Sequence, residues 1–281
     1  MPGVSRPILS ASQFEKLRKI VYDRAGIHFQ DTKKYVLESR LSRRLEELDL
    51  DDFDQYLMFL TCGPYQTDEF QEMFNRITIN ETSFFRNEPQ LDTFEQRFLP
   101  ELLEKRKATK TLRIWSAACS SGEEPYTLAM ILHRSLGIRL ADWRIEILGT
   151  DISEKVLQTA QSGRYTHYAV KSTNPMVLGR YFKKDGMDYV LDDEIRSMVH
   201  FEKLNLKDTY AARRFGNFDV IFCRNVMIYF DDPMKKSCVQ MFHKQLADDG
   251  VLMIGHSETL RSLDVAFEQV NMPQAFAYRK I

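Results

Sequence analysis

Residues 218–230, FDVIFCRNVMIYF, decide the fold class of this chain. The apolar run at residues 220–222 is typical of a strand that is covered on both faces of a parallel sheet. Arg224 and Asn225 follow, at the point where this strand is expected to end. Ligands of open α/β sheets bind outside the carboxyl ends of the strands, so these two polar residues are candidate ligand contacts. A purely structural role at the strand end fits this stretch equally well.

Strands and helices alternate on both sides of this stretch, which predicts a doubly wound, mostly parallel α/β sheet. Residues 163–198 interrupt the alternation, are rich in Tyr, Lys and Asp, and are predicted to form a small inserted β-subdomain. Residues 267–270 and 275–278 are candidates for a closing hairpin. We expect strands at residues 112–115, 143–148, 199–202, 218–222 and 250–255, and helices at residues 125–133, 153–160 and 234–246.

The N-terminal part of the chain has helical periodicity instead. Ser12 with Glu15 three residues later has the spacing of a capping box, and Asp31 is a candidate cap for a second helix. Two further helices are predicted at residues 52–60 and 66–77. We therefore divide the chain into a helical domain (1–88), a linker (89–100) and an α/β domain (101–281).

Composition excludes several classes of protein. The net charge of −1 argues against non-specific nucleic-acid binding, and the four cysteines lack the CxxC spacing of zinc or redox sites. Residues 1–10 lack the apolar core of a signal peptide, and no apolar run approaches the roughly 18 residues of a membrane span. We expect a cytoplasmic, monomeric protein without a metal and without insertion into the membrane.

The turn after the first strand of the α/β domain indicates the type of cofactor. Residues 116–122 are small, which lets a ligand approach the backbone, and Glu123 and Glu124 follow at the start of a helix. Glutamate is also common at helix N-termini for structural reasons. Two carboxylates there would nevertheless repel a pyrophosphate, which dinucleotide sites hold at this position. A cofactor with hydroxyls, an ammonium and a sulfonium, such as S-adenosylmethionine, is compatible with them.

Three further segments are candidate contacts. Asp151 ends the second strand, where an acidic residue can accept hydrogen bonds from ribose hydroxyls or cap the next helix. Asn205 and Leu206 follow the third strand, where an amide and an apolar side chain suit an adenine. Residues 80–86, NETSFFR, fit either a turn or a site.

Five segments, in order, resemble the CheR family of chemotaxis-receptor glutamate methyltransferases. They are NETSFFR (80–86), WSAACSSGEEPY (115–126), GTDI (149–152), FCRNVMIYF (222–230) and GHSE (255–258), and the similarity extends from about Ser12 to the C-terminus. The resemblance implies a helical N-terminal domain and an S-adenosylmethionine-dependent methyltransferase domain that carries a β-subdomain. A methyltransferase of the same fold with another protein acceptor, and a non-catalytic cofactor-sensing adaptor, are the alternatives.

The resemblance also implies roles for individual residues. Arg86 and Tyr229 match the residues beside the transferring methyl group, and Glu124 is favoured over Glu123 as the cofactor contact. The reaction would methylate a glutamate carboxylate, which is already ionised at neutral pH and needs no general base. The implied cofactor contacts are Asn80, Thr82, Arg86, Glu124, Asp151, Asn205, Leu206, Arg224 and Asn225.

A cluster of basic residues is the candidate docking surface for the receptor. Lys33, Arg40, Arg43 and Arg44 fall on one arc of the second helix, which alone is equally typical of a solvated helix face. The family's helical domain meets the acidic methylation helices of methyl-accepting receptors, which favours docking. The expected β-subdomain has a short connection with one clear turn at residues 185–186, which favours a member that does not need the receptor's C-terminal tail.

Overall fold

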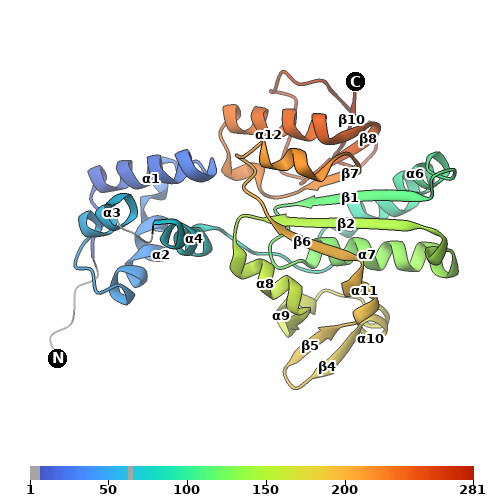
Figure 1. Ribbon diagram of the computed structural model, residues 1–281, viewed down its shortest axis with the longest axis horizontal. Coiled ribbons are helices and arrows are strands. Elements are labelled where there is room, and N and C mark those ends of the chain that lie inside the picture. Colours follow the sequence, from blue (N-terminus) through green and yellow to red (C-terminus); the bar gives the residue numbers. More distant parts are fainter. Residues whose placement is uncertain (1–6, 63–65) are drawn as a thin grey trace. The chain divides into compact units, whose positions relative to one another are not determined.

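The computed structural model describes residues 7–62 and 66–281 (Figure 1). By its internal contacts the chain divides into two compact units, one of residues 1–79 with 229–231 and one of residues 80–228 with 232–281. We describe the helical unit first and the α/β unit second. Among the described residues, no helix has the length and apolar character required to cross a bilayer.

The helical unit is built from short amphipathic helices. α1 (Ala11–Ala25), η1 (Asp31–Lys33), α2 (Lys34–Glu47), α3 (Phe53–Cys62) and α4 (Gln66–Ile77) follow one another. Each of the four α-helices buries one apolar face, and Leu17, Leu41, Tyr56 and Met73 are fully buried in this unit.

Two of the predicted helix caps are wrong. α1 begins two residues earlier than expected, because the Ser10 hydroxyl accepts from the Gln13 amide while the Gln13 side chain accepts from the Ser10 amide. This is a capping box that starts at Ser10, not at Ser12. Asp31 begins the short 3₁₀ turn η1, and α2 starts three residues later at Lys34 without a side-chain cap.

The α/β unit contains a seven-stranded sheet in the order β6-β2-β1-β7-β8-β10-β9. The five strands from β6 to β8 are parallel, and β10 and β9 are added antiparallel. This confirms the predicted doubly wound, mostly parallel sheet and its closing hairpin. The strands are β1 (Thr111–Ala117), β2 (Arg144–Asp151), β6 (Val199–Lys203), β7 (Phe218–Cys223), β8 (Leu246–Ile254), β9 (Phe267–Gln269) and β10 (Ala277–Lys280).

Both faces of the sheet are covered, because successive side chains of a strand point to opposite faces. Ile114 of β1 belongs to the core formed with α7 (Glu123–Leu136), whereas Trp115 packs edge-on against Phe242 of α12 (Asp232–Gln245), with ring centroids 5.3 Å apart. η3 (Gly137–Asp142) and α8 (Glu154–Ser162) complete the helices between β1 and β3.

The predicted linker at residues 89–100 is helical. α5 (Glu88–Thr93), the π-helical turn η2 (Phe94–Phe98) and α6 (Leu99–Lys105) are continuous, and their apolar side chains belong to the core of the α/β unit. Gln90 is fully buried and donates to the carbonyls of Ile254 and Ala275, at 2.8 and 3.0 Å. These bonds fix the segment to the end of β8.

The predicted β-subdomain is present as a separate three-stranded antiparallel sheet, β3-β5-β4. In Figure 1 its β4–β5 hairpin and α10 lie away from the main sheet. Gly186 makes the hairpin turn with a φ of 61°, in the left-handed region that favours glycine. Its elements are β3 (Arg164–Thr166), α9 (His167–Val170), α10 (Pro175–Tyr181), β4 (Phe182–Asp185), β5 (Asp188–Leu191) and α11 (Asp193–Ser197).

Candidate functional site

The turn between β1 and α7 has an unusual backbone. Ala118, Ser120 and Gly122 have φ values of 60°, 51° and 91°, in the left-handed region. Non-glycine residues in this region are uncommon and cluster at functional sites. Gly122 is also required for space, because a Cβ there would lie 2.8 Å from the Cβ of Ala160 in α8. The turn is therefore held in a conformation that a random loop would not adopt.

Asp151 at the end of β2 connects this turn with the next helix. Its side chain accepts from the backbone amides of Ser120 and Ser153, both at 2.9 Å, and is almost fully buried. Burial raises the pKa of Asp151, and the amide donors oppose that rise. The Ile152 amide also acts on this carboxylate, whose two oxygens offer about four acceptor positions, so both of the roles considered for Asp151 are compatible with its geometry.

The neighbouring carboxylates of Glu123 and Glu124 lie in different environments. Glu123 is 3 % exposed and accepts from the Ser121 hydroxyl, and burial raises its pKa to about 7. Glu124 accepts from the Ser116 hydroxyl at 2.7 Å and from the Arg224 guanidinium at 2.9 Å. Glu124 thus lies in a polar network, while Glu123 lies in the core beside the turn.

Arg224, directly after β7, joins three of the five sequence motifs. Its guanidinium pairs with Glu124 of α7 and donates to the backbone carbonyl of Arg86 at 2.6 Å. The Arg224 side chain is only 4 % exposed, and its Nε has no partner among the described residues. These contacts bring residues 80–86, the start of α7 and the end of β7 to the same edge of the sheet.

Residues 80–87 are fixed onto the α/β unit by backbone contacts. The Asn80 carbonyl accepts from the Ser120 hydroxyl at 3.2 Å, and the Phe85 amide donates to the Thr127 hydroxyl at 3.2 Å. Phe84 is fully buried, with its ring edge-on to Tyr165 and Phe182 of the β-subdomain. Phe84 therefore acts as the anchor that positions the polar residues on either side of it.

Within this segment, Arg86 donates to the carbonyl of Glu81 at 2.8 Å, which closes the loop on itself, and Thr82 is half-buried. Asn205 caps its own turn by accepting from the Lys207 amide at 3.0 Å. Leu206 is 6 % exposed, and its carbonyl accepts from the Cys238 thiol. Leu204, just before them, donates its amide to the Asp151 carbonyl at 3.0 Å, so this turn adjoins the end of β2.

Glu258 is a functional candidate that the residue-by-residue reading of the sequence missed. Its carboxylate accepts from the backbone amides of Asn225 and Val226, both at 3.1 Å, and of Gly255 at 2.6 Å. Burial raises the pKa of Glu258. Asn225 has a φ of 60°, so Glu258 stabilises a strained loop that carries a predicted cofactor contact. The GHSE segment at residues 255–258 is the sequence signal that points to this carboxylate.

Tyr229 ends the 3₁₀ turn η5 (Met227–Tyr229), and by its contacts it belongs to the helical unit. Its carbonyl accepts from the His28 amide at 2.8 Å, and the neighbouring Phe230 forms a β-bridge with Ile27. The chain after β7 therefore leaves the α/β unit for three residues and returns at Asp232. The two residues with an expected catalytic role thus belong to different units, with Arg86 in the α/β unit.

The four basic residues predicted to dock a receptor have different surroundings in α2 and η1. Arg40 donates to the carbonyls of Ile77 and Thr78 at the end of α4, at 2.7 and 3.1 Å. Lys33 is exposed, and the Arg43 side chain is 82 % exposed, with Glu47 3.4 Å away.

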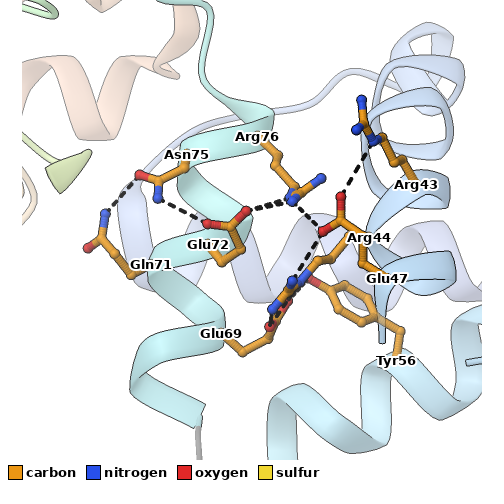
Figure 2. Close-up of polar contacts among 9 residues, drawn as sticks. All are labelled: Arg43, Arg44, Glu47, Tyr56, Glu69, Gln71, Glu72, Asn75 and Arg76. Carbon is orange, nitrogen blue, oxygen red and sulfur yellow. Dashed lines mark hydrogen bonds and ion pairs between the residues drawn. The ribbon is translucent and has the colours of Figure 1, made fainter. Parts of the chain in front are cut away.

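Arg44 belongs to an internal network. It pairs with Glu69, whose side chain is 2 % exposed, at 2.6 Å, and Tyr56 donates to the same carboxylate at 2.8 Å (Figure 2). Arg76 bridges Glu47 and Glu72 beside this pair. The contacts of Arg44 hold α2 against α4, so Lys33 and Arg43 are the members of the basic set that remain accessible.

Other groups near the site show no sign of reactivity. Cys119 and Cys223 are fully buried, and burial raises the pKa of both thiols well above the ordinary value. Within residues 7–62 and 66–281, no cluster of His, Cys, Asp and Glu side chains could hold a metal ion.

Comparison with known protein families gives a match for each of the two parts of the chain. Residues 12–78 match the CheR methyltransferase all-alpha domain, and residues 80–276 match the CheR methyltransferase SAM binding domain. The boundary between these matches coincides with the division between the two compact units at residues 79 and 80.

Curated relatives are similar over nearly their whole length. The chain is 35 % identical to chemotaxis protein methyltransferase 2 of Vibrio cholerae, over 97 % of this chain and 94 % of that protein. It is 38 % identical to the chemotaxis protein methyltransferases of Borreliella burgdorferi (90 % of each chain) and Escherichia coli (93 % of this chain and 89 % of that one). These matches confirm the resemblance and the S-adenosylmethionine cofactor, and the chain belongs to the CheR methyltransferase family.

Proposed function

We propose that this protein transfers the methyl group of S-adenosylmethionine to glutamate side chains of methyl-accepting chemotaxis receptors, giving glutamyl methyl esters and S-adenosylhomocysteine. The observation that carries the proposal is the Arg224 network. One buried guanidinium joins Glu124 and the Arg86 backbone, and it thereby assembles the segments in which the cofactor and catalytic residues are expected.

The residues at this edge of the sheet fit the cofactor. Asp151 retains acceptor capacity for ribose hydroxyls, and Glu124 offers a carboxylate that suits a cationic amino acid group. Asn205 and Leu206 suit an adenine. They follow Leu204, whose backbone amide donates to the Asp151 carbonyl. Asn80, Thr82, Arg86 and Asn225 complete the proposed contacts, and Arg224 is proposed to contribute by positioning Glu124 and Arg86. The Glu124 carboxylate would repel a phosphate placed beside it.

The reaction requires alignment more than acid–base chemistry. When bound, S-adenosylmethionine supplies an electrophilic methyl group on a sulfonium. A glutamate carboxylate oxygen would bond to that carbon as the carbon–sulfur bond breaks, so no residue of this chain would have to move a proton. Because the carboxylate is already the nucleophile at neutral pH, holding the partners in line can supply roughly 7–11 kcal/mol. We assign this orienting role to Arg86 and Tyr229.

Receptor docking is assigned to the exposed cations of the helical unit, Lys33 and Arg43. The methylation helices of the receptors are acidic, so the encounter should be steered by charge and weakened by salt. Arg40 and Arg44 contribute indirectly, because they hold α2 in place. The protein is proposed to act in the cytoplasm as a monomer.

The decisive experiment incubates the protein with methyl-labelled S-adenosylmethionine and receptor cytoplasmic fragments, and then measures base-labile label. We expect label on the receptor that is lost in alkali, and strongly reduced label with Arg86→Ala. The matched control is Arg97→Ala, a substitution in the same unit outside the network. Stable label, or label on another protein only, would show a different acceptor; absence of turnover with normal cofactor binding would show an adaptor.

A further inference from the structure

A positively charged hollow lies in the α/β unit, away from the motifs described above. It has a volume of about 350 Å³, within the range of sites for small molecules. One wall is a single face of α12 and the other is the segment before β7 that contains η4 (Ala211–Phe215). Its lining residues are Thr209, Arg213, Gly216, Asn217, Ser237, Gln240, Met241, Lys244 and Gln245.

The two walls are joined at one end. Gln245 is buried and donates from its side chain to the Ala212 carbonyl at 2.5 Å. Residues 237, 240, 241, 244 and 245 are spaced by three and four along α12, so they share one face of that helix. The shape of the hollow is therefore determined by a regular helix and a fixed contact.

The charge of the lining is entirely positive. Arg213 and Lys244 line the hollow, and none of the lining residues is acidic. In the part of the chain that the structure describes, neither cation forms an ion pair. Arg213 has its guanidinium 5.4 Å from the ring centroid of Tyr210 instead. By contrast, the adjacent Arg214 pairs with Glu202 at 2.8 Å.

Two cations that face one hollow without a carboxylate favour an anion. A phosphate suits them, because guanidinium and ammonium groups are its usual partners. The other lining side chains are mostly hydroxyls and amides, from Thr209, Asn217, Ser237, Gln240 and Gln245, with Met241 as the apolar exception. Such groups pair with hydroxyls rather than with apolar surface. The volume also exceeds what a phosphate alone would fill.

We infer that this hollow binds a small hydroxylated phosphate ester, of the sugar phosphate class, with its phosphate between Arg213 and Lys244. The site is separate from the cofactor edge. Gly216 and Asn217 precede β7, whereas Arg224 and Asn225 follow it, and six extended residues span roughly 20 Å. Both sites can therefore be occupied at the same time.

The test uses the full chain saturated with S-adenosylhomocysteine, and it follows backbone amide signals by heteronuclear NMR. The probes are ribose 5-phosphate, inorganic phosphate and ribose. We expect ribose 5-phosphate to shift the Gly216 and Gln245 signals in a saturable manner. Inorganic phosphate should bind at least about threefold more weakly, and ribose should cause no shift.

Arg213→Gln and Lys244→Gln should each weaken ribose 5-phosphate binding about fivefold or more, and the double variant should abolish it. Arg214→Gln and Lys235→Gln are matched controls, since each removes a neighbouring cation that already has a carboxylate partner, and they should bind like the parent. The spectra also show whether each variant is folded. Unchanged affinity in the double variant, equal binding of inorganic phosphate, or absence of shifts at Gly216 would overturn the inference.

Discussion

The carboxylate of Glu258 accepts a hydrogen bond from the backbone amide of Asn225, at 3.1 Å and across 33 positions of sequence. The same carboxylate accepts from Val226 and Gly255, so one side chain stabilises the loop after β7 and the end of β8 together. Asn225 is left-handed, and it keeps this conformation because its surroundings hold it there.

We expect Glu258→Gln to lower methyl transfer about tenfold and to destabilise the α/β unit by about 1–3 kcal/mol, because the amide offers one acceptor oxygen to three donors. Turnover and unfolding in urea followed by tryptophan fluorescence are the measurements, since Trp115 and Trp143 both lie in this unit. Glu268→Gln, an exposed substitution, is the control. Parent-like turnover would remove Glu258 from the positioning of the loop.

The Arg224–Glu124 pair gives a second prediction. Arg224→Met leaves the Glu124 carboxylate, which is 13 % exposed, without its cation. The substitution should lower the free energy of unfolding by about 3 kcal/mol. Glu124→Gln added to Arg224→Met should recover part of this loss, because no uncompensated charge remains. A double-mutant cycle from urea unfolding measures the coupling, and additive effects of the two substitutions would contradict it.

Asp151→Asn should weaken binding of S-adenosylhomocysteine about tenfold to a hundredfold. The substitution removes the charge, and the new NH₂ group would face a backbone amide donor that now bonds the carboxylate. Isothermal titration calorimetry measures the change. Asp142→Asn, at an exposed position in the same unit, should bind like the parent; unchanged affinity of Asp151→Asn would exclude the ribose role.

The raised pKa of Glu123 predicts that the stability of the protein depends on pH. Its folded-state pKa is raised by burial from the ordinary 4.5 to about 7. The folded state therefore keeps a proton that the unfolded state has lost, and the stabilising contribution is complete below pH 4.5 and is lost as the pH rises to about 7. Glu123→Gln should remove this loss, with a gain on the order of 3 kcal/mol at pH 8.

Urea unfolding at pH 5 and pH 8 tests the effect of Glu123, with tryptophan fluorescence as the signal. Glu104→Gln, whose side chain is 75 % exposed, is the control that should leave the pH profile unchanged. A Glu123→Gln variant with the parent's pH profile would show that this carboxyl does not titrate differently in the folded state.

Substitutions of the basic residues in the helical unit can distinguish a role in receptor docking from a role in stability. Lys33→Glu with Arg43→Glu should raise the KM for receptor about tenfold and reduce its salt dependence, with little change in Tm. Arg44→Gln should lower the Tm of the helical unit, measured by circular dichroism, because it leaves the buried Glu69 carboxylate without its cation. Receptor methylation that is indifferent to both salt and the charge reversal would contradict the docking surface.

The sequence was sufficient for the main features that depend on local pattern. The apolar run at residues 220–222, the alternation of strands and helices, and the ordered motifs predicted the parallel sheet, the inserted β-subdomain and the family. Each of these is determined by side chains within a few residues of one another, whose periodicity and turn chemistry are visible along the chain. Local pattern misled at α1, where Ser10 with Gln13 forms the capping box instead of Ser12 with Glu15.

Only the tertiary structure decided which charges pair. The Glu123 and Glu124 side chains are adjacent in sequence, yet one is buried in the core and the other bonds a guanidinium 100 positions away. Arg44 resembles Arg43 in the sequence, but it alone pairs with the buried Glu69. Such partners are far apart in the sequence, and only folding of the chain brings them together. The strength of each contact depends on how deeply it is buried, which the local sequence pattern does not determine.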